Sequence, residues 1–280
     1  MTYEQIIYEV EDPVATITLN RPEAFNAWTD RMAGEVRNAL ARAAADPAVV
    51  GIVLSGAGKG FCAGADMEEV AALSSGQTDP EGASTAGSSE PMPGEAGWGE
   101  DLRGPYTYFL SIPKPVVAAL NGSAAGIGLV LALACDARFM AEGGVLTTAF
   151  AQRGLVAEFG SGWLLSHLVG PARAIDLLFS GRRVSAREAE ALGLVNEAVP
   201  SGQALDAARG YIQELAQRSS PSAIAAMKRQ VYQFHHEGLA RAQADADATM
   251  LDSLGWPDLP EGVQSFLEKR PPQFRRLGQR

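Results

Sequence analysis

Short apolar segments alternate with helical patterns through the first two thirds of the chain. Residues 6–11 and 15–19 carry the pattern of two short strands, which predicts a β-hairpin. Thr29 or Asp30 stands where a side-chain oxygen can cap a helix running to about residue 45. Residues 49–54 and 116–120 are continuous apolar runs, typical of strands buried on both faces. The pattern therefore predicts an α/β fold.

The pattern changes after Pro200, where strand signals end and helical periodicity continues to the C-terminus. The expected helices cover residues 203–217, 222–235, 238–253 and 261–269. We therefore expect a core at residues 1–199 and a helical region at residues 200–280.

One long segment interrupts the core at about residues 74–100. It is rich in Gly, Ser, Pro and Glu, contains no Lys or Arg, and has little to bury. We expect it to be mobile. A loop of this length in a compact domain is usually a tolerated surface insertion or an active-site lid. The composition slightly favours the surface insertion.

The charge balance narrows the possible partners. The chain has 33 acidic and 23 basic side chains and a net charge of -10, which repels nucleic acid and anionic membrane surfaces. Residues 115–135 are uncharged and long enough to span a bilayer, but Asn121, Ser123 and three glycines divide them into a strand, a loop and a helix. We expect neither nucleic acid nor a membrane as a partner.

Cys62 and Cys135 lie in apolar contexts, without a disulfide framework or metal-type spacing to the three histidines. They are interpreted as core thiols in a reducing compartment, and no metal is expected. The N-terminus lacks a basic region followed by an apolar run, so it does not resemble a targeting segment. These features favour a cytoplasmic location.

Common motifs for nucleotide binding and serine hydrolysis are incomplete. Leu131 stands where a dinucleotide fingerprint starting at Gly126 needs its third glycine, and no serine has the glycines of a nucleophile elbow. Two glycine-containing loops remain, at residues 55–69 and 121–136, each between a buried strand and a helix. Such loops present unpaired backbone N–H groups and the positive end of a helix dipole. Two of these donors directed at one oxygen would form an oxyanion hole.

Several separated segments together resemble the enoyl-CoA hydratase/isomerase (crotonase) superfamily. They are Leu19-Asn20-Arg21-Pro22 with Asn26-Ala27, Gly60-Phe61-Cys62-Ala63-Gly64-Ala65-Asp66, Lys114 to Ala119, Asn121 to Asp136, Gly193-Leu194-Val195-Asn196 and Phe266 to Phe274. The resemblance covers nearly the whole chain. It implies a crotonase-like spiral of ββα repeats, with a C-terminal helical region that forms a homotrimer or a hexamer of two trimers. It also implies an acyl-CoA thioester substrate whose coenzyme A is part of the substrate, with no permanently bound cofactor.

The resemblance assigns roles to residues of both loops. The oxyanion donors should be the amides of Ala65 and Ile127, within loops that include Gly64 and Gly126. Ala63 and Asp66 should contact coenzyme A, and Ala24 should lie near its pantetheine. Asp66 has an equally good interpretation as the cap of the helix that begins at Met67. Further pocket residues are expected to be Met67, Phe150 and Trp163.

The acids of the chain bear on the reaction. Val130 and Phe150 occupy the two positions at which family hydratases carry glutamates, and apolar side chains cannot pass a proton. Glu158 matches the position of the acid in the double-bond isomerases, and a shift from β,γ to α,β needs only one base. Val156, Phe159 and Trp163 should desolvate Glu158 and raise its pKa.

Three functions follow, in order of preference. The leading hypothesis is a double-bond isomerase that uses Glu158. The alternatives are an enoyl-CoA hydratase with non-standard acid and base residues, and a non-catalytic scaffold that binds acyl-CoA. Glu158 also has a purely structural interpretation, as a helix cap or as an ion-pair partner of Arg153.

Overall fold

The computed structural model describes residues 2–75, 93–94, 96–98, 102–233 and 238–278. Most of the segment expected to be a mobile insertion, residues 74–100, lies outside the described residues. Trp98, which belongs to that segment, is buried and packs in the main core. Within the described part of the insertion, Trp98 therefore contributes a large apolar side chain to the core, which the polar composition of the segment does not predict.

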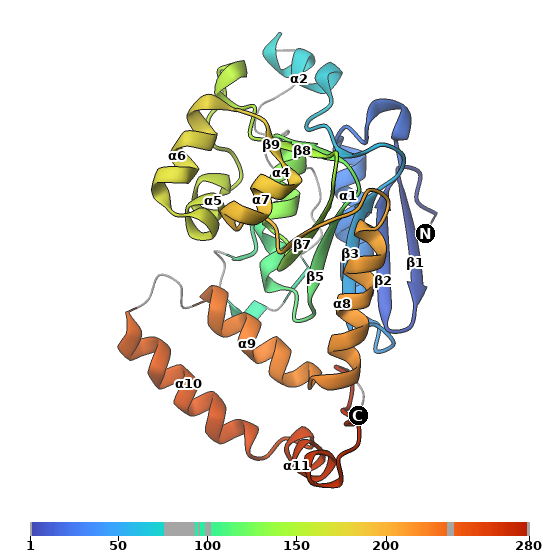
Figure 1. Cartoon of the computed structure of the whole chain (residues 1–280), viewed down its shortest axis with the longest axis vertical. Helices are drawn as coiled ribbons and strands as arrows, with labels where there is room; N and C mark the ends of the chain where they lie inside the picture. The colour runs from blue at the N-terminus through green and yellow to red at the C-terminus, as the bar shows by residue number, and fades with distance from the viewer. Residues whose placement is uncertain (1, 76–92, 95, 99–101, 234–237, 279–280) are drawn as a thin grey trace.

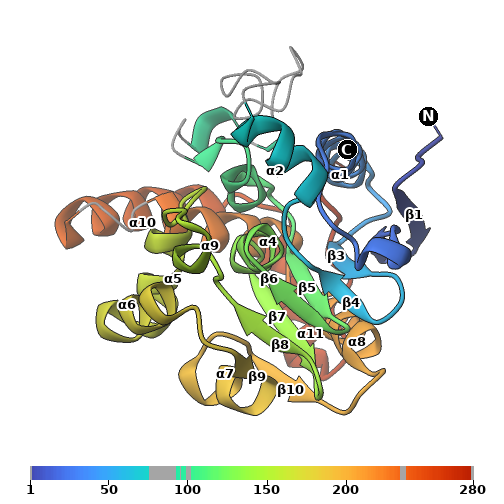
Figure 2. The same ribbon diagram turned by 90° about the horizontal axis from the view of Figure 1, so that it is seen from above.

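Two sheets form the centre of the described chain (Figures 1 and 2). One has six strands in the order β1-β2-β3-β5-β7-β10, and the other has four in the order β4-β6-β8-β9. The strands are β1 (Ile6–Glu11), β2 (Val14–Leu19), β3 (Gly51–Gly56), β4 (Gly60–Cys62), β5 (Val116–Leu120), β6 (Ser123–Ala125), β7 (Ala137–Ala141), β8 (Val145–Thr147), β9 (Val184–Ser185) and β10 (Glu197–Val199).

Helices surround these sheets. The α-helices are α1 (Asp30–Ala45), α2 (Met67–Ser74), α4 (Ile127–Leu133), α5 (Ser161–Val169), α6 (Pro171–Ser180), α7 (Ala186–Leu192), α8 (Ala204–Arg218), α9 (Pro221–Gln233), α10 (Leu239–Ser253) and α11 (Asp258–Glu268). Short 3-10 helices are η1 (Pro22–Ala24), η2 (Ala96–Trp98), η4 (Thr107–Ser111) and η5 (Ala151–Arg153). The predicted cap of α1 is confirmed, because Thr29 Oγ1 accepts a hydrogen bond of 3.1 Å from the Met32 amide.

The order of elements repeats. β3, β5 and β7 lie in the large sheet, and each is followed by a strand of the small sheet, β4, β6 or β8. A helix follows each strand pair: α2, α4 and, after η5, α5. Figure 2 looks down on these turns, with the fully buried α4 near the middle. The predicted α/β fold and its spiral of ββα units are therefore confirmed.

The predicted strands agree closely with the observed ones. β1 and β2 form the expected antiparallel hairpin, with Ile6 opposite Leu19, while β3 and β5 pair in parallel. β5 has the predicted limits. β3 begins two residues later than its apolar run, because the Val49 amide donates to Asp46 O in a turn. Burial alone therefore does not mark the start of β3.

The helices after residue 200 divide into two groups. α8 packs against the large sheet, where Ala208 and Ile212 join a core that includes Val53 and Val117. α9, α10 and α11 extend away from the two sheets as a separate layer (Figure 1). The four predicted helices are present, with small shifts at their described ends, and the predicted end of the second, at residues 234 and 235, lies outside the described residues. The division into domains at residues 199 and 200 stays a prediction.

A buried ion pair joins α9 to the core. Lys228 Nζ lies 2.7 Å from Asp136 Oδ2 and also donates to the carbonyl oxygens of Phe109 and Lys114. The same Asp136 oxygen accepts a hydrogen bond of 2.7 Å from the Val116 amide. Asp136 is thus a hydrogen-bonded structural residue. Among the described helices, none is both long enough and apolar enough to cross a membrane.

Candidate active site

The two glycine-containing loops predicted from the sequence meet in space. Gly64 has a φ of 106°, and a Cβ atom at this position would lie 3.0 Å from the carbonyl oxygen of Ala125 in the second loop. A larger residue would push the loops apart, and its L-configuration would also be strained at that φ. Glycine at position 64 therefore permits the close approach.

The backbone of Trp28 pairs with the first glycine-containing loop. Its amide donates to Gly64 O at 2.8 Å, and its carbonyl accepts from the Asp66 amide at 2.9 Å. These bonds form a parallel bridge between Trp28 and Ala65. Because successive peptide groups in extended chain point in opposite directions, the Ala65 amide is directed away from Trp28.

The second expected donor, the amide of Ile127, lies at the start of a helix. Ile127 is the first residue of α4, where the amide has no partner within the helix. Among the described residues, neither the Ala65 nor the Ile127 amide donates a hydrogen bond to a backbone carbonyl. Two N–H groups are therefore available beside a shared cavity.

Residues of both loops line a cavity of about 820 Å³. It brings together all of the residues predicted for the site except two. Those that line it are Ala24, Ala63, Gly64, Ala65, Asp66, Met67, Gly126, Ile127, Phe150 and Glu158. Most of the residues that the family resemblance suggests therefore lie on one contiguous surface.

Val130 and Trp163 lie elsewhere among the described residues. Val130 is fully buried within α4, and its amide donates to Gly126 O at 3.0 Å. Trp163 packs against the core, and its ring lies 4.0 Å from the ring of His167. The lining of the cavity therefore lends no support to substrate contact by these two side chains.

Glu158 is partly buried at the edge of the cavity. Burial raises the pKa of its carboxyl group above the ordinary value. None of the described residues forms an ion pair or a side-chain hydrogen bond with it. Arg153 Nη1 donates instead to Ala149 O at 2.9 Å, and α5 begins without a side-chain cap. The two structural interpretations of Glu158 therefore find no support.

The expected desolvation of Glu158 is only partly correct. Val156 is 76% exposed, so it does not shield the carboxylate as the sequence suggests. Its side chain points into solvent because the turn after η5 runs along the surface, where residues 151–157 are all exposed. Phe159 does pack against the core. It stacks on Tyr106, with ring centroids 4.2 Å apart.

Asp66 has the structural role that the sequence allowed. Its Oδ1 accepts from the Glu68 amide at 3.0 Å, which caps α2, and its Oδ2 lies 2.9 Å from Arg21 Nη1. These contacts, the amide of Glu68 first, lower the pKa of the Asp66 carboxyl group. The residue also lines the cavity. Its contact with coenzyme A stays a prediction.

The side chain of Asn26 connects the segment Leu19 to Ala27 with the first glycine-containing loop. Its side-chain amide donates to the carbonyl oxygens of Ala57 and Gly60, both at 2.9 Å. Its Oδ1 accepts from the Arg21 amide. Fully buried, Asn26 holds the segment before Trp28 against the loop that carries the Ala65 amide.

Among the residues to which sequence reasoning gave no place in the site are Arg21, Arg153 and Tyr106; Arg153 was considered only as a partner of Glu158. The two arginines line the cavity, and Arg21 lies within a motif that was recognised without a role. Tyr106 accepts a hydrogen bond of 3.1 Å from Trp28 Nε1. No local pattern marks Tyr106, which follows the polar insertion.

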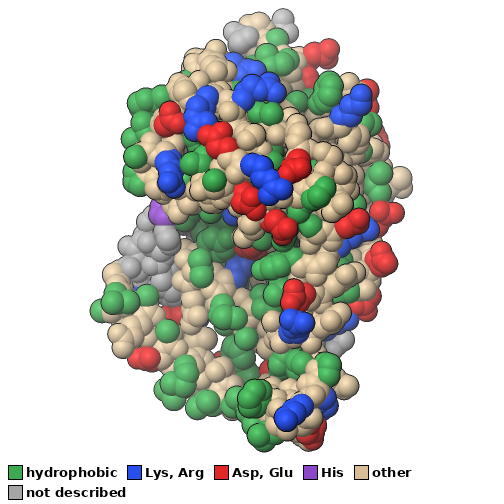
Figure 3. Space-filling model, viewed as in Figure 1, with side chains coloured by type: hydrophobic (Ala, Val, Ile, Leu, Met, Phe, Trp, Pro, Cys, Tyr) green, Lys and Arg blue, Asp and Glu red, His purple; other side chains and the backbone are tan. Residues whose placement is uncertain are grey.

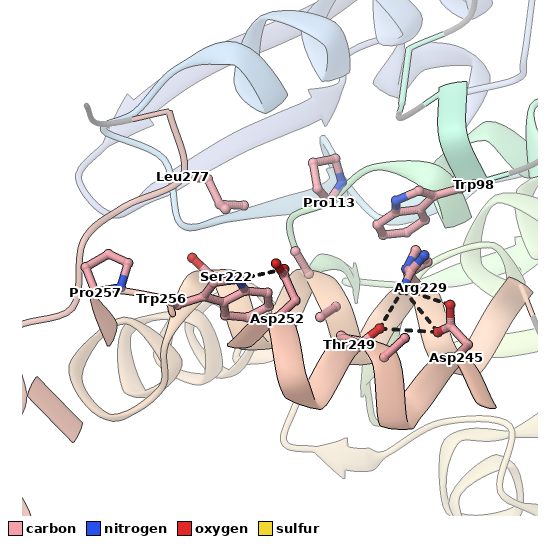
Figure 4. Close-up of a pocket in the computed structure, with 13 residues that line it drawn as sticks. Trp98, Pro113, Ser222, Arg229, Asp245, Thr249, Asp252, Trp256, Pro257 and Leu277 are labelled. Carbon is pink, nitrogen blue, oxygen red and sulfur yellow. Dashed lines mark hydrogen bonds and ion pairs between the residues drawn. The ribbon is translucent and has the colours of Figure 1, made fainter. Parts of the chain in front are cut away.

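A second cavity, of about 740 Å³, lies between α9 and α10 (Figure 4). Its charged groups pair with one another. Arg229 Nη2 contacts Asp245 Oδ2 at 3.1 Å and Thr249 Oγ1 at 3.0 Å, and Trp256 Nε1 donates to Asp252 (Figure 4). These contacts of Arg229, Asp245 and Asp252 are thus made to one another or to neighbouring side chains of the same lining.

Comparisons with known proteins agree with this geometry. A family model described as enoyl-CoA hydratase/isomerase matches residues 9–277. A probable enoyl-CoA hydratase from Rhodobacter capsulatus is 36% identical over 278 residues, covering 98% of this chain and 99% of the relative. A 1,2-epoxyphenylacetyl-CoA isomerase from Escherichia coli is 33% identical, covering 97% and 98%.

Solved structures extend the likeness to three dimensions. The crystal structure of an enoyl-CoA hydratase from Polaromonas sp. JS666 matches with a TM-score of 0.85 at 30% identity, covering 96% of this chain and 99% of that one. Sequence and fold therefore agree over nearly the full length. This chain belongs to the enoyl-CoA hydratase/isomerase family.

Proposed function

We propose that this protein moves a β,γ double bond of an acyl-CoA thioester into the α,β position, with Glu158 as the proton carrier. The observation that carries the proposal is the shared cavity. Glu158 lines the same surface as the available amides of Ala65 and Ile127 and has no partner of its own among the described residues. A single base and two oxyanion donors are what this reaction needs.

The chemistry balances without a cofactor. The thioester oxygen accepts hydrogen bonds from the Ala65 and Ile127 amides, which makes the α-carbon acidic. Glu158 removes an α-proton, the dienolate forms, and Glu158 returns a proton to the γ-carbon. Each oxyanion donor typically lowers the barrier by about 3 to 4 kcal/mol. The raised pKa of Glu158 makes it a stronger base than an exposed glutamate.

Coenzyme A enters this proposal only as part of the substrate. Ala24 and Ala63 would contact its pantetheine and adenine ends, and Asp66 would lie beside them at the start of α2. Met67, which is 61% exposed, and Phe150 would border the acyl group. The lining of the cavity supports this arrangement, because all five side chains face it.

Separate assays test the reaction. We would incubate the protein with β,γ-hexenoyl-CoA and with α,β-hexenoyl-CoA and follow isomerisation and hydration. Glu158→Gln should lower kcat for isomerisation by at least about a hundredfold, the usual minimum for loss of a general base. The matched control is Glu68→Gln, which removes a negative charge from the same cavity. Isomerisation that survives Glu158→Gln would overturn the proposal.

A hydratase is the second candidate, because the names of the relatives favour it. The position of Phe150 on the cavity wall argues against it, since a phenyl ring cannot activate water. Rapid hydration of α,β-hexenoyl-CoA would favour this alternative. A protein that binds hexenoyl-CoA without turning it over would instead be the acyl-CoA scaffold.

The same proposal includes a trimer or a hexamer. Exposed apolar side chains gather on the C-terminal helices (Figure 3), including Leu239, Phe266 and Leu267, which are 81%, 82% and 73% exposed. A surface of this kind is typical of an interface. Analytical ultracentrifugation should give the mass of three or six chains, and a monomer would contradict the proposal. The cytoplasmic location also stays a prediction.

A further inference from the structure

A chain of aromatic contacts connects the two halves of the proposed site. It begins at Trp28, whose backbone pairs with the segment around Ala65. The indole N–H of Trp28 donates to the hydroxyl oxygen of Tyr106 at 3.1 Å. The two rings are 6.2 Å apart at an angle of 46°. Tyr106 is thus tied to the residue that holds one oxyanion donor.

Tyr106 also contacts the turn that carries Glu158. Its ring stacks on Phe159, with centroids 4.2 Å apart and planes tilted by 48°. Phe159 has a φ of 52°, a left-handed conformation that side chains other than glycine adopt rarely, and Gly160 follows with a φ of 75°. Such a backbone persists only where surrounding contacts determine it. The stack on Tyr106 is the aromatic contact that Phe159 makes among the described residues.

The electrostatics agree with this geometry. Burial raises the pKa of Tyr106 to about 12, and the negative charge of Glu158 contributes to the increase. The phenol therefore stays neutral and protonated over the whole range in which Glu158 titrates. Its ring is partly buried and packs against the core beside the ring of Phe159.

We propose that Tyr106 is a positioning residue that fixes the Glu158 turn relative to the oxyanion amide of Ala65. The inference rests on the proposed role of Glu158 and adds the element that sets its place. A hydrogen bond links Tyr106 to Trp28, and a ring contact links it to Phe159. Tyr106 acts through Trp28 on one side and through Phe159 on the other. These contacts keep the distance between the Glu158 carboxylate and the Ala65 amide constant.

The test compares three variants with the wild type. Tyr106→Leu removes the stack and the hydrogen bond, whereas Tyr106→Phe retains the stack and removes only the acceptor for Trp28. The matched control is Tyr108→Leu, because Tyr108 lies nearby in η4, is fully buried and packs on Phe109 with centroids 4.8 Å apart. For each protein, kcat, KM and the pH dependence of kcat/KM are measured with β,γ-hexenoyl-CoA.

Tyr106→Leu should lower kcat by roughly tenfold to a hundredfold, the effect of a small misplacement of a reacting group, with little change in KM. Water that enters the gap should also lower the pKa of Glu158, so the acidic limb of the profile should move to lower pH. Tyr106→Phe should show a smaller loss. Tyr108→Leu should lower the melting temperature and leave both kcat and the acidic limb of the pH profile unchanged.

The outcomes separate this inference from the function on which it rests. Isomerisation that survives Glu158→Gln defeats the proposed function. Isomerisation lost in Glu158→Gln but unchanged in rate and pH profile in Tyr106→Leu defeats the positioning role alone. If Tyr106→Leu does not fold, the same measurements on Tyr106→Phe and Trp28→Phe test the positioning role instead. An unchanged kcat and acidic limb in both would overturn the inference.

Discussion

Gly64 and Gly126 face each other so closely that a Cβ atom added to either would lie 4.0 Å from the Cα atom of the other. Both have positive φ angles, 106° and 50°, which glycine adopts without strain. The two loops that carry the Ala65 and Ile127 amides therefore meet at a pair of glycines. Their contact sets the spacing of the proposed oxyanion hole.

Gly64→Ala should reduce both stability and activity. A left-handed residue with a Cβ atom costs about 1 to 3 kcal/mol, and the new methyl group would lie 3.0 Å from Ala125 O. Displacement of the Ala65 amide should lower kcat by up to about a hundredfold. Urea denaturation and isomerisation kinetics measure the two effects.

Gly34→Ala is the control for this substitution. Gly34 lies within α1 and has open space around its Cα atom, so alanine there should add about 0.5 to 1 kcal/mol of stability without changing kcat. Equal behaviour of the two variants would contradict the importance of the contact between the loops.

Glu158→Gln should stabilise the fold at neutral pH while it removes activity. The folded-state pKa of Glu158 is raised above 4.5, so the folded protein binds this proton more tightly than the unfolded chain does. The wild type therefore loses stability as pH rises from 4.5 through the folded pKa, and glutamine avoids the loss. Melting temperatures across this range should show a gain at neutral pH that disappears below pH 4.5. A gain that is independent of pH would argue against the burial of the charge.

Asp66→Ala should destabilise α2 by about 1 kcal/mol, because the amide of Glu68 loses its cap. Asp66→Asn can keep the cap and loses only the charge that pairs with Arg21. The pKa of Asp66 is lowered from 3.8, so its charge stabilises the fold above that value and the benefit is lost as pH falls through the folded pKa. The difference between wild type and Asp66→Asn in chemical denaturation should therefore vanish in acid. A difference that persists there would have another origin.

Lys228→Met should cost about 3 to 5 kcal/mol, the usual effect of breaking a buried ion pair. The substitution leaves the charge of Asp136 and two carbonyl oxygens without the ammonium group. Arg218→Met is the matched control, because its pair with Glu214 is 73% exposed on the arginine side and should contribute at most about 1 kcal/mol. Similar losses in denaturant titrations of the two variants would contradict the role of Lys228 as the anchor of α9.

The sequence alone determined the elements whose signals are local. The apolar run at β5 predicts its limits, because a strand buried on both faces needs uninterrupted apolar residues and ends where polar ones begin. Thr29 predicts the start of α1, because a capping oxygen acts within one turn of its own helix. The loops around Gly64 and Gly126 were predicted for the same reason.

Tertiary structure decided the environment of each functional side chain. Periodicity did not reveal that Val156 points into solvent or that Val130 lies outside the cavity wall. Nor did it place Tyr106 between Trp28 and Phe159, residues that are far apart along the chain. Such contacts depend on how sheets and helices pack, and no local pattern encodes the distance between separated segments. The sequence therefore determined which loops could hold an oxyanion, and only the packing of the chain decided which side chains surround Glu158.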